Sequence, residues 1–178
     1  MTCSELVTTY LCEQGAPYTL QHHRTTYTAH DTAATEHIAD QQVAKVVVVV
    51  ADDRPVMLVL PASLKVNLAH LGPLIGAQTV RLAHERELVR IFPDCEIGAM
   101  PPFGNLYGLP VYVDQALTAN ETIVCQAGTH TETIRLAYAD FARLVQPVVV
   151  AFGRALPARF GPNESVAARE RRRSDMFV

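Results

Sequence analysis

Lys45 is the first residue whose setting could support chemistry, because it stands at the head of an apolar run, the five valines at 46–50. Valine is β-branched and a poor helix former, so the run predicts a β-strand. Both faces of that strand are apolar, which places it inside a sheet with cover on either side. A buried ammonium group is costly unless it is paired. Lys45 must therefore reach water, a carboxylate or a ligand, and extension to the surface is the simplest alternative.

Two further segments carry candidate residues. The sequence GAMPPFG at 98–104 combines two glycines and two prolines with apolar side chains. Proline lacks an N–H donor and glycine permits positive φ, so the segment cannot be a regular helix or strand. It predicts a rigid loop, and apolar rigid loops tend to line binding sites. At 128–130, Gly-Thr-His predicts a turn in which His130 is either a base at neutral pH or a hydrogen-bonding residue.

Several common kinds of site lack support in the sequence. There is no G-x-S-x-G motif and no cysteine within the candidate segments, so no protein nucleophile is indicated. Four histidines near the N-terminus do not have the spacing of a metal site, so neither a metal nor a cofactor is expected; these four are His22, His23, His30 and His37. The four cysteines are far apart, without a C-x-x-C pair. They predict reduced thiols, with neither a disulfide framework nor a zinc knuckle.

Composition predicts one globular domain. The 178 residues are 49% hydrophobic and 19% charged, enough for a sound core. No apolar run is long enough for a membrane span, and the N-terminus does not have the pattern of a secretion signal, so we expect a cytoplasmic protein without a membrane partner.

The charge is distributed unevenly along the chain. Residues 1–152 contain 9 Lys+Arg and 15 Asp+Glu, whereas residues 153–178 contain 6 Arg and 3 Asp+Glu. We therefore expect a domain over 1–152 and an arginine-rich extension over 153–178. Such an extension suits a phosphate-rich partner; a solvated, frayed terminus is the alternative.

Hydrophobic periodicity and turn residues predict a mixture of helices and strands. Helices are expected over 4–14, 32–42, 63–71, 84–92 and 138–145, and strands over 18–22, 44–50, 56–60, 80–83, 109–113, 122–126, 131–136 and 147–152. Thr2 to Glu5 resembles a capping box for the first helix. Ser63 is the expected N-cap of the third helix, which should end at Gly72-Pro73. Because 44–60 should form a hairpin, the sheet should be mixed.

The three candidate segments together resemble the YbaK/prolyl-tRNA synthetase editing-domain family of aminoacyl-tRNA deacylases. The matching pieces are Ala44-Lys45-Val46, the loop Gly98-x-x-x-Pro102-Phe103-Gly104 and Gly128-Thr129-His130, supported by 109–114 and 134–136. The resemblance covers about residues 1–152. It implies an α+β fold in which a curved, mixed and partly barrel-like sheet is wrapped by helices, with one pocket for an aminoacyl-adenosine end.

The resemblance also implies roles for the site residues. Lys45 would hold the phosphate or ribose side of the terminal nucleotide. The loop would offer backbone N–H groups to the oxyanion that forms during ester hydrolysis. We take Lys45, Gly98 and His130 as catalytic candidates. The substrate-binding candidates are Val46, Ala99, Met100, Pro101, Pro102, Phe103, Gly104, Gly128 and Thr129. Water or a substrate hydroxyl would attack, without a metal, while Asp114 and Arg135 are expected to be structural.

Val46 departs from the family pattern, in which the residue after the lysine is often small and polar. Met100 and Phe103 suggest an apolar pocket wall that favours a small, uncharged amino acid such as Ala, Cys, Ser or Pro. The expected function is deacylation of mischarged aminoacyl-tRNA in trans. The expected partner is tRNA, alone or together with an aminoacyl-tRNA synthetase, and a monomer is the starting expectation. The alternatives are an inactive tRNA- or synthetase-binding module and a hydrolase of free esters.

Overall fold

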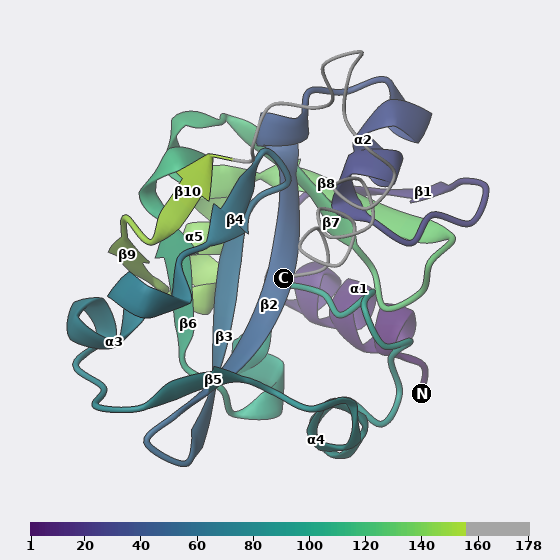
Figure 1. The fold of residues 1–178 in the computed structure, drawn as a ribbon. Helices are drawn as coiled ribbons and strands as arrows, with labels where there is room; N and C mark the ends of the chain where they lie inside the picture. Colours follow the sequence, from purple (N-terminus) through teal and green to yellow (C-terminus); the bar gives the residue numbers. More distant parts are fainter. Residues whose placement is uncertain (156–178) are drawn as a thin grey trace, which may run out of the picture.

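A mixed β-sheet forms the centre of the molecule, and helices pack around it (Figure 1). The computed structural model describes residues 1–155. The remainder of the predicted arginine-rich extension, residues 156–178, lies outside the described part. No helix among the described residues is long and apolar enough to cross a membrane.

Helices and strands alternate along the chain. The helices are α1 (Cys3–Glu13), α2 (Ala29–Glu36), α3 (Leu68–Ile75), α4 (Glu85–Ile91) and α5 (Tyr138–Val145), with short 3-10 turns η1 (Asp40–Gln42), η2 (Gly104–Tyr107) and η3 (Gln115–Ala119). The strands are β1 (Tyr18–His22), β2 (Val43–Ala51), β3 (Arg54–Pro61), β4 (Leu64–Val66), β5 (Val80–Leu82), β6 (Val111–Asp114), β7 (Thr122–Gln126), β8 (Glu132–Ala137), β9 (Val148–Val150) and β10 (Gly153–Ala155).

The valine-rich strand β2 lies in the middle of the sheet, as the sequence predicts. The strand order is β1-β8-β7-β2-β3-β6-β9, with β5 as an additional partner of β2. β2 runs antiparallel to β3 and parallel to β7, so the predicted mixed sheet is confirmed. The two-residue turn of the hairpin is formed by Asp52 and Asp53, which both have positive φ. This is the geometry that a tight hairpin turn needs.

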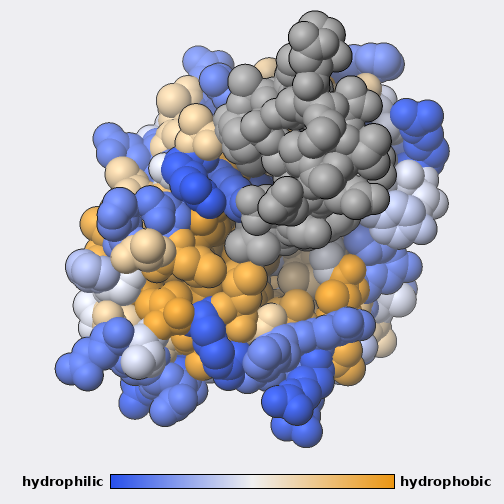
Figure 2. All heavy atoms as spheres, in the orientation of Figure 1, coloured by the Kyte–Doolittle hydropathy of each residue, from blue (hydrophilic) through white to orange (hydrophobic). Residues whose placement is uncertain are grey.

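Both faces of β2 are covered. Ala44 and Val48 belong to the larger core, which also contains α1 and α5 residues. Val49 belongs to a second core with β3, β4 and α3. Because side chains alternate along a strand, odd and even positions of β2 are buried by different elements. Figure 2 shows apolar side chains over α3 and the neighbouring strands, framed by hydrophilic groups.

The first helix is confirmed in detail. Thr2 and Glu5 form the predicted capping box, in which each side chain accepts a hydrogen bond from the other residue's backbone N–H. Gly15 follows the C-cap with φ of 63°. The helix therefore begins and ends where its local residues indicate.

The second helix is shifted from its predicted range. It covers Ala29–Glu36, because the Thr28 hydroxyl accepts a hydrogen bond from the Asp31 N–H and caps the helix four residues earlier than expected. It ends at His37, whose left-handed backbone (φ 54°) stops the helix. The predicted continuation to Gln42 is wrong except for the short 3-10 turn η1.

The prediction of a helix beginning at Ser63 is also wrong. Leu64–Val66 forms β4, whose backbone pairs with β10, a partner about 90 residues away that no local pattern reveals. The helix starts only after Asn67 and passes through Pro73 to end at Gly76, which is left-handed with φ of 72°. A short helix can contain Pro73 because proline removes only one backbone hydrogen bond.

Regular structure continues beyond Phe152, since β10 belongs to the first residues of the expected extension. Asp114 holds this junction: its carboxylate accepts hydrogen bonds from the N–H groups of Phe152 (2.9 Å) and Gly153 (2.6 Å). Asp114 is thus a structural residue, as expected from the sequence. The domain boundary near residue 152 stays a prediction.

Candidate functional site

The central sheet divides beside Lys45. On one side, β2 pairs with β3 along its whole length. On the other, it pairs with β7 only at Val43 and Ala44, and with β5 only from Val49 onwards. Between these two partners, residues 45–47 of β2 are half-buried, whereas their neighbours in the strand are buried. The gap between β7 and β5 therefore leaves residues 45–47 more exposed than the rest of β2; we call this gap the opening.

Lys45 is half-buried in this opening. Burial, together with a smaller effect of the positive charge of Lys65, lowers the pKa of its amine to about 8. A lysine at this pKa is still mostly protonated at pH 7. Lys65 lies on β4 and is buried, and its cross-strand partner in the β4–β10 ribbon is Arg154. Lys45 and Lys65 are therefore near enough to interact, in a domain that is otherwise acidic.

The 98–104 loop is joined to the 128–130 turn by backbone hydrogen bonds. The Gly128 N–H donates to the Ala99 carbonyl (3.0 Å), and the Glu96 N–H donates to the Gly128 carbonyl (2.8 Å). The turn directly follows β7, the strand that pairs with Val43 and Ala44 just before Lys45. The fold thus links the loop to the turn, and connects the turn to the strand beside the start of β2.

Gly98 lies against the His130 ring. A Cβ atom at position 98 would be 3.4 Å from His130 Cε1, and the backbone has φ of 92°. Both the space and the conformation favour glycine here. The Gly98 N–H donates to Met100 Sδ at 3.2 Å. Because a thioether is a weak acceptor, a carbonyl or oxyanion could readily replace it.

His130 holds two loops through its ring. Nδ1 is 3.0 Å from the Thr26 carbonyl and Nε2 is 3.1 Å from the Ile97 carbonyl. Both partners are acceptors, so a neutral imidazole can donate to only one of them and an imidazolium to both. The His130 backbone N–H also donates to Glu96 Oε2 at 2.7 Å. These contacts favour the hydrogen-bonding alternative, since both ring nitrogens are directed at carbonyl groups of the protein.

The side chains of the loop face the core. Ala99 and Phe103 are fully buried and Met100 is nearly so. The Phe103 ring packs edge-on against Tyr10 (6.4 Å between centroids) and Phe141 (5.9 Å). Core packing therefore accounts for Phe103, and the apolar wall expected from this side chain is part of the interior. Pro101, Pro102 and Gly104 are buried as well.

Residues 23–144 match the aminoacyl-tRNA editing domain family. The chain belongs to that family. This editing domain is 31% identical over 126 residues to a proline–tRNA ligase from Thiobacillus denitrificans, in an alignment that covers 70% of the chain. The chain spans only 21% of that ligase, about a fifth of its length.

Solved structures confirm the fold of the editing domain. A candidate trans-editing enzyme for prolyl tRNA synthetase superposes with a TM-score of 0.77 at 20% identity, covering 87% of this chain and 99% of that one. A protein described only as hypothetical gives a TM-score of 0.75 at 19% identity and covers 83% of this chain and 99% of its own. At such identities the likeness concerns the fold alone.

The editing domain also uses residues that sequence reasoning missed. Thr26 and Tyr27 belong to the segment between β1 and α2. The Thr26 N–H donates to the His130 carbonyl (2.9 Å), so the two residues are paired in both directions. The Tyr27 ring is 5.0 Å from the His130 ring and is 70% exposed. In the sequence, the only signal for these two residues was an aromatic residue within a polar, irregular segment.

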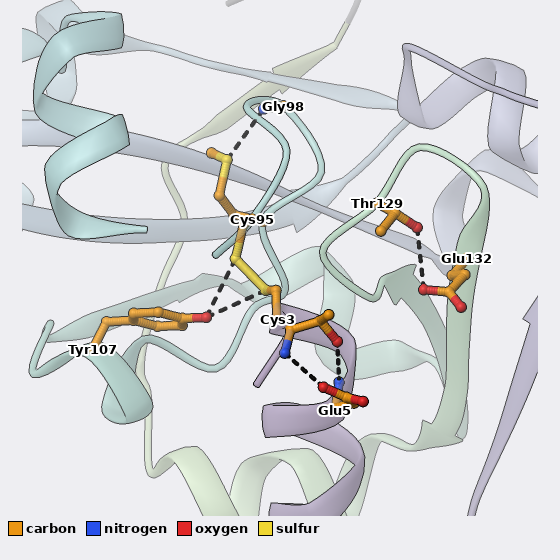
Figure 3. The surroundings of a disulfide bond; sticks show 9 residues. Cys3, Glu5, Cys95, Gly98, Tyr107, Thr129 and Glu132 are labelled. Atoms are coloured by element: carbon orange, nitrogen blue, oxygen red, sulfur yellow. Dashed lines mark hydrogen bonds between the residues drawn. A yellow bond between two sulfur atoms is a disulfide. The ribbon is translucent and has the colours of Figure 1, made fainter. Parts of the chain in front are cut away.

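The prediction that all cysteines are reduced is wrong for two of them. Cys3 and Cys95 form a disulfide, with Cα atoms 5.1 Å apart (Figure 3). Spacing could not reveal the pair because 92 positions separate the two residues, and only the fold places the start of α1 beside the segment after α4. Cys12 and Cys125 are free thiols, and burial raises the pKa of Cys125 to about 12, which makes it a poor nucleophile.

Proposed function

We propose that this editing domain is a deacylase that acts in trans on mischarged tRNA and hydrolyses the ester of a small amino acid such as Ala, Cys, Ser or Pro. The observation that carries the proposal is the opening beside β2, where a half-buried lysine lies at the division of the sheet close to the linked loop and turn. Membership of the editing family gives this arrangement its substrate class.

Each group has a distinct role in the proposed reaction. The Lys45 ammonium group binds a phosphate or the ribose of the terminal nucleotide as a point charge. The Gly98 N–H turns from Met100 Sδ to the ester carbonyl and stabilises the oxyanion. His130 positions the loop through the Ile97 carbonyl rather than acting as the base. Gly128 and Thr129 form the far wall, next to the aminoacyl group.

Water or a substrate hydroxyl supplies the attacking oxygen. When water adds to the ester carbonyl, the C–O bond to the ribose breaks and the ribose oxygen takes up a proton. The products are the free amino acid and a tRNA with a free terminal hydroxyl. No covalent enzyme intermediate is needed, which agrees with the lack of a nucleophile in the three segments.

A panel of tRNAs charged with Ala, Ser, Cys or Pro tests the proposal. The protein should deacylate at least one of them, and Lys45→Ala should lower its kcat/KM by about 100-fold, the effect of losing one charge-assisted contact. Lys65→Ala is a matched control that removes a cation from the same region. Activity on free amino-acid esters equal to that on charged tRNA would favour the small-ester hydrolase instead.

An inactive binding module is the second candidate function. Val46 favours it, because the side chain beside Lys45 cannot make a hydrogen bond and packs against the larger core. Under this alternative, no ester in the panel would be hydrolysed, while filter binding would still retain tRNA. That pair of results would overturn the deacylase proposal.

A further inference from the structure

The Cys3–Cys95 disulfide lies at the base of the linked loop and turn. Cys95 precedes Glu96, the residue that hydrogen-bonds both the Gly128 carbonyl and the His130 N–H. On the Cys3 side of the disulfide, the Cys3 N–H donates to the Asp94 carbonyl at 3.2 Å. The disulfide therefore fixes the start of the segment that leads into Gly98 (Figure 3).

The disulfide also contacts the turn directly. Gly128 has φ of 106°, and a Cβ atom at this position would overlap the Cβ and Sγ atoms of Cys3. The backbone of the turn thus packs against the bridge, without a side chain between them. One covalent link supports both halves of the proposed site, the loop through Cys95 and the turn through Cys3.

From this placement we propose that Cys3 and Cys95 are positioning residues of the editing site. Their disulfide holds the 96–100 loop against the 128–130 turn, and reduction loosens both segments and lowers turnover. The inference rests on the proposed function for its effect on turnover, but the effect on the two segments is independent of it. Disulfides are rare in reducing compartments, and those that occur there are usually catalytic or redox-sensing.

The two sulfur atoms differ in access. Cys3 is 1% exposed, whereas Cys95 is partly exposed. A small thiolate, such as that of glutathione, can attack Cys95 Sγ and expel Cys3 as a thiolate; a second thiol then releases Cys95 from the mixed disulfide. Two protein thiols and one small-molecule disulfide result. Oxidised glutathione drives the reverse exchange, with the two electrons passing from the protein thiols to the small disulfide.

Tyr107 is placed to assist this exchange. Its hydroxyl lies 3.3 Å from both sulfur atoms. Burial raises the pKa of Tyr107, with a smaller contribution from the negative charge of Asp94, so the hydroxyl keeps its proton at neutral pH. It can therefore donate a hydrogen bond to the Cys3 thiolate when that group leaves.

The test compares the full-length protein after treatment with oxidised or reduced glutathione, together with Cys3→Ser and Cys95→Ser. Hydrogen exchange is measured over 96–104 and 127–132, with strands β4 and β5, which pack in the second core, as an internal reference. The kcat/KM is measured on charged tRNA. Reduction and either substitution should speed exchange in the two segments by about tenfold, because the equilibrium constant for local opening rises by the same factor. Turnover should fall several-fold and recover on reoxidation. Cys12→Ser, at an exposed free thiol, should change neither quantity.

Three outcomes would overturn the inference. The first is that thiol titration finds no disulfide after oxidation. The second is equal exchange of the two segments in both redox states. The third is exchange that rises equally in β4 and β5, which would indicate general destabilisation. If a serine variant fails to fold, the reduced wild-type protein still decides. If no ester is hydrolysed in either state, the proposed function fails, while the exchange measurement still judges the positioning role.

Discussion

The two halves of strand β2 are made from nearly the same residue type but differ in their surroundings. In the first half, residues 45–47 are half-buried where the sheet divides, and in the second half Val48, Val49 and Val50 are buried beneath their neighbours. Val46 and Val49 are chemically identical, yet Val46 is half-buried beside Lys45 and Val49 is fully buried in the second core. The difference arises from the partner strands, because β5 covers the second half and β7 leaves the first after Ala44.

A pair of identical substitutions tests this comparison most strongly. Val49→Thr places a hydroxyl in a fully buried position and should lower the free energy of unfolding by about 2 kcal/mol, the cost of burying a polar group with poor compensation. Val46→Thr should cost less than about 0.5 kcal/mol, typical of a site that solvent reaches. Denaturant unfolding of both variants measures the contrast. Equal losses would mean that the two halves are equally buried.

Val46→Thr also bears on function. The substitution restores a polar side chain beside Lys45 and should raise deacylation a few-fold, while Val49→Thr should leave kcat/KM unchanged at temperatures where it is folded. The measurement is kcat/KM on the most active charged tRNA. A Val46→Thr protein with unchanged activity would show that the residue after the lysine does not limit turnover.

The pH dependence of activity tests the role of the Lys45 charge in the first half of β2. Burial lowers the pKa of Lys45 to about 8, so the ammonium group is lost as the pH rises through this value. If the charge binds a phosphate, kcat/KM should fall by about tenfold per pH unit above that point. The rate must be corrected for spontaneous ester hydrolysis, which also rises with pH. Lys45→Arg, which keeps its charge, should flatten the decline.

The same pKa shift should also affect stability. The Lys45 amine has a lower pKa in the folded protein, about 8, than its ordinary value of 10.5. Between these values the unfolded chain binds more protons, so stability contributed by this group should rise as the pH increases from 8 to 10.5. Below pH 8 both states are protonated and the contribution is constant. Urea unfolding of the wild type and of Lys45→Met is measured at pH 7.5 and 9.5. Between these pH values the wild type should gain stability relative to Lys45→Met. An equal change in the two proteins would place the amine in solvent.

Most elements could be predicted because their signals are local. Valine's β-branching indicates β2, and the capping box at Thr2 and Glu5 marks the start of α1. The failures occurred where a distant partner decided the outcome. Leu64–Val66 became a strand by pairing with β10. The shift of α2 is an exception, because its cap is the local contact between Thr28 and the Asp31 N–H.

The candidate site shows the same division. The sequence by itself determined the three segments and their chemistry: an amine at a strand end, a glycine–proline loop and a turn with histidine. Only the tertiary structure decided that the sheet divides beside Lys45, that Phe103 faces the core, that His130 holds two carbonyls and that Cys3 meets Cys95. Backbone preference depends on neighbours in the chain, whereas burial, register and cross-linking depend on residues that are remote in sequence and adjacent in space.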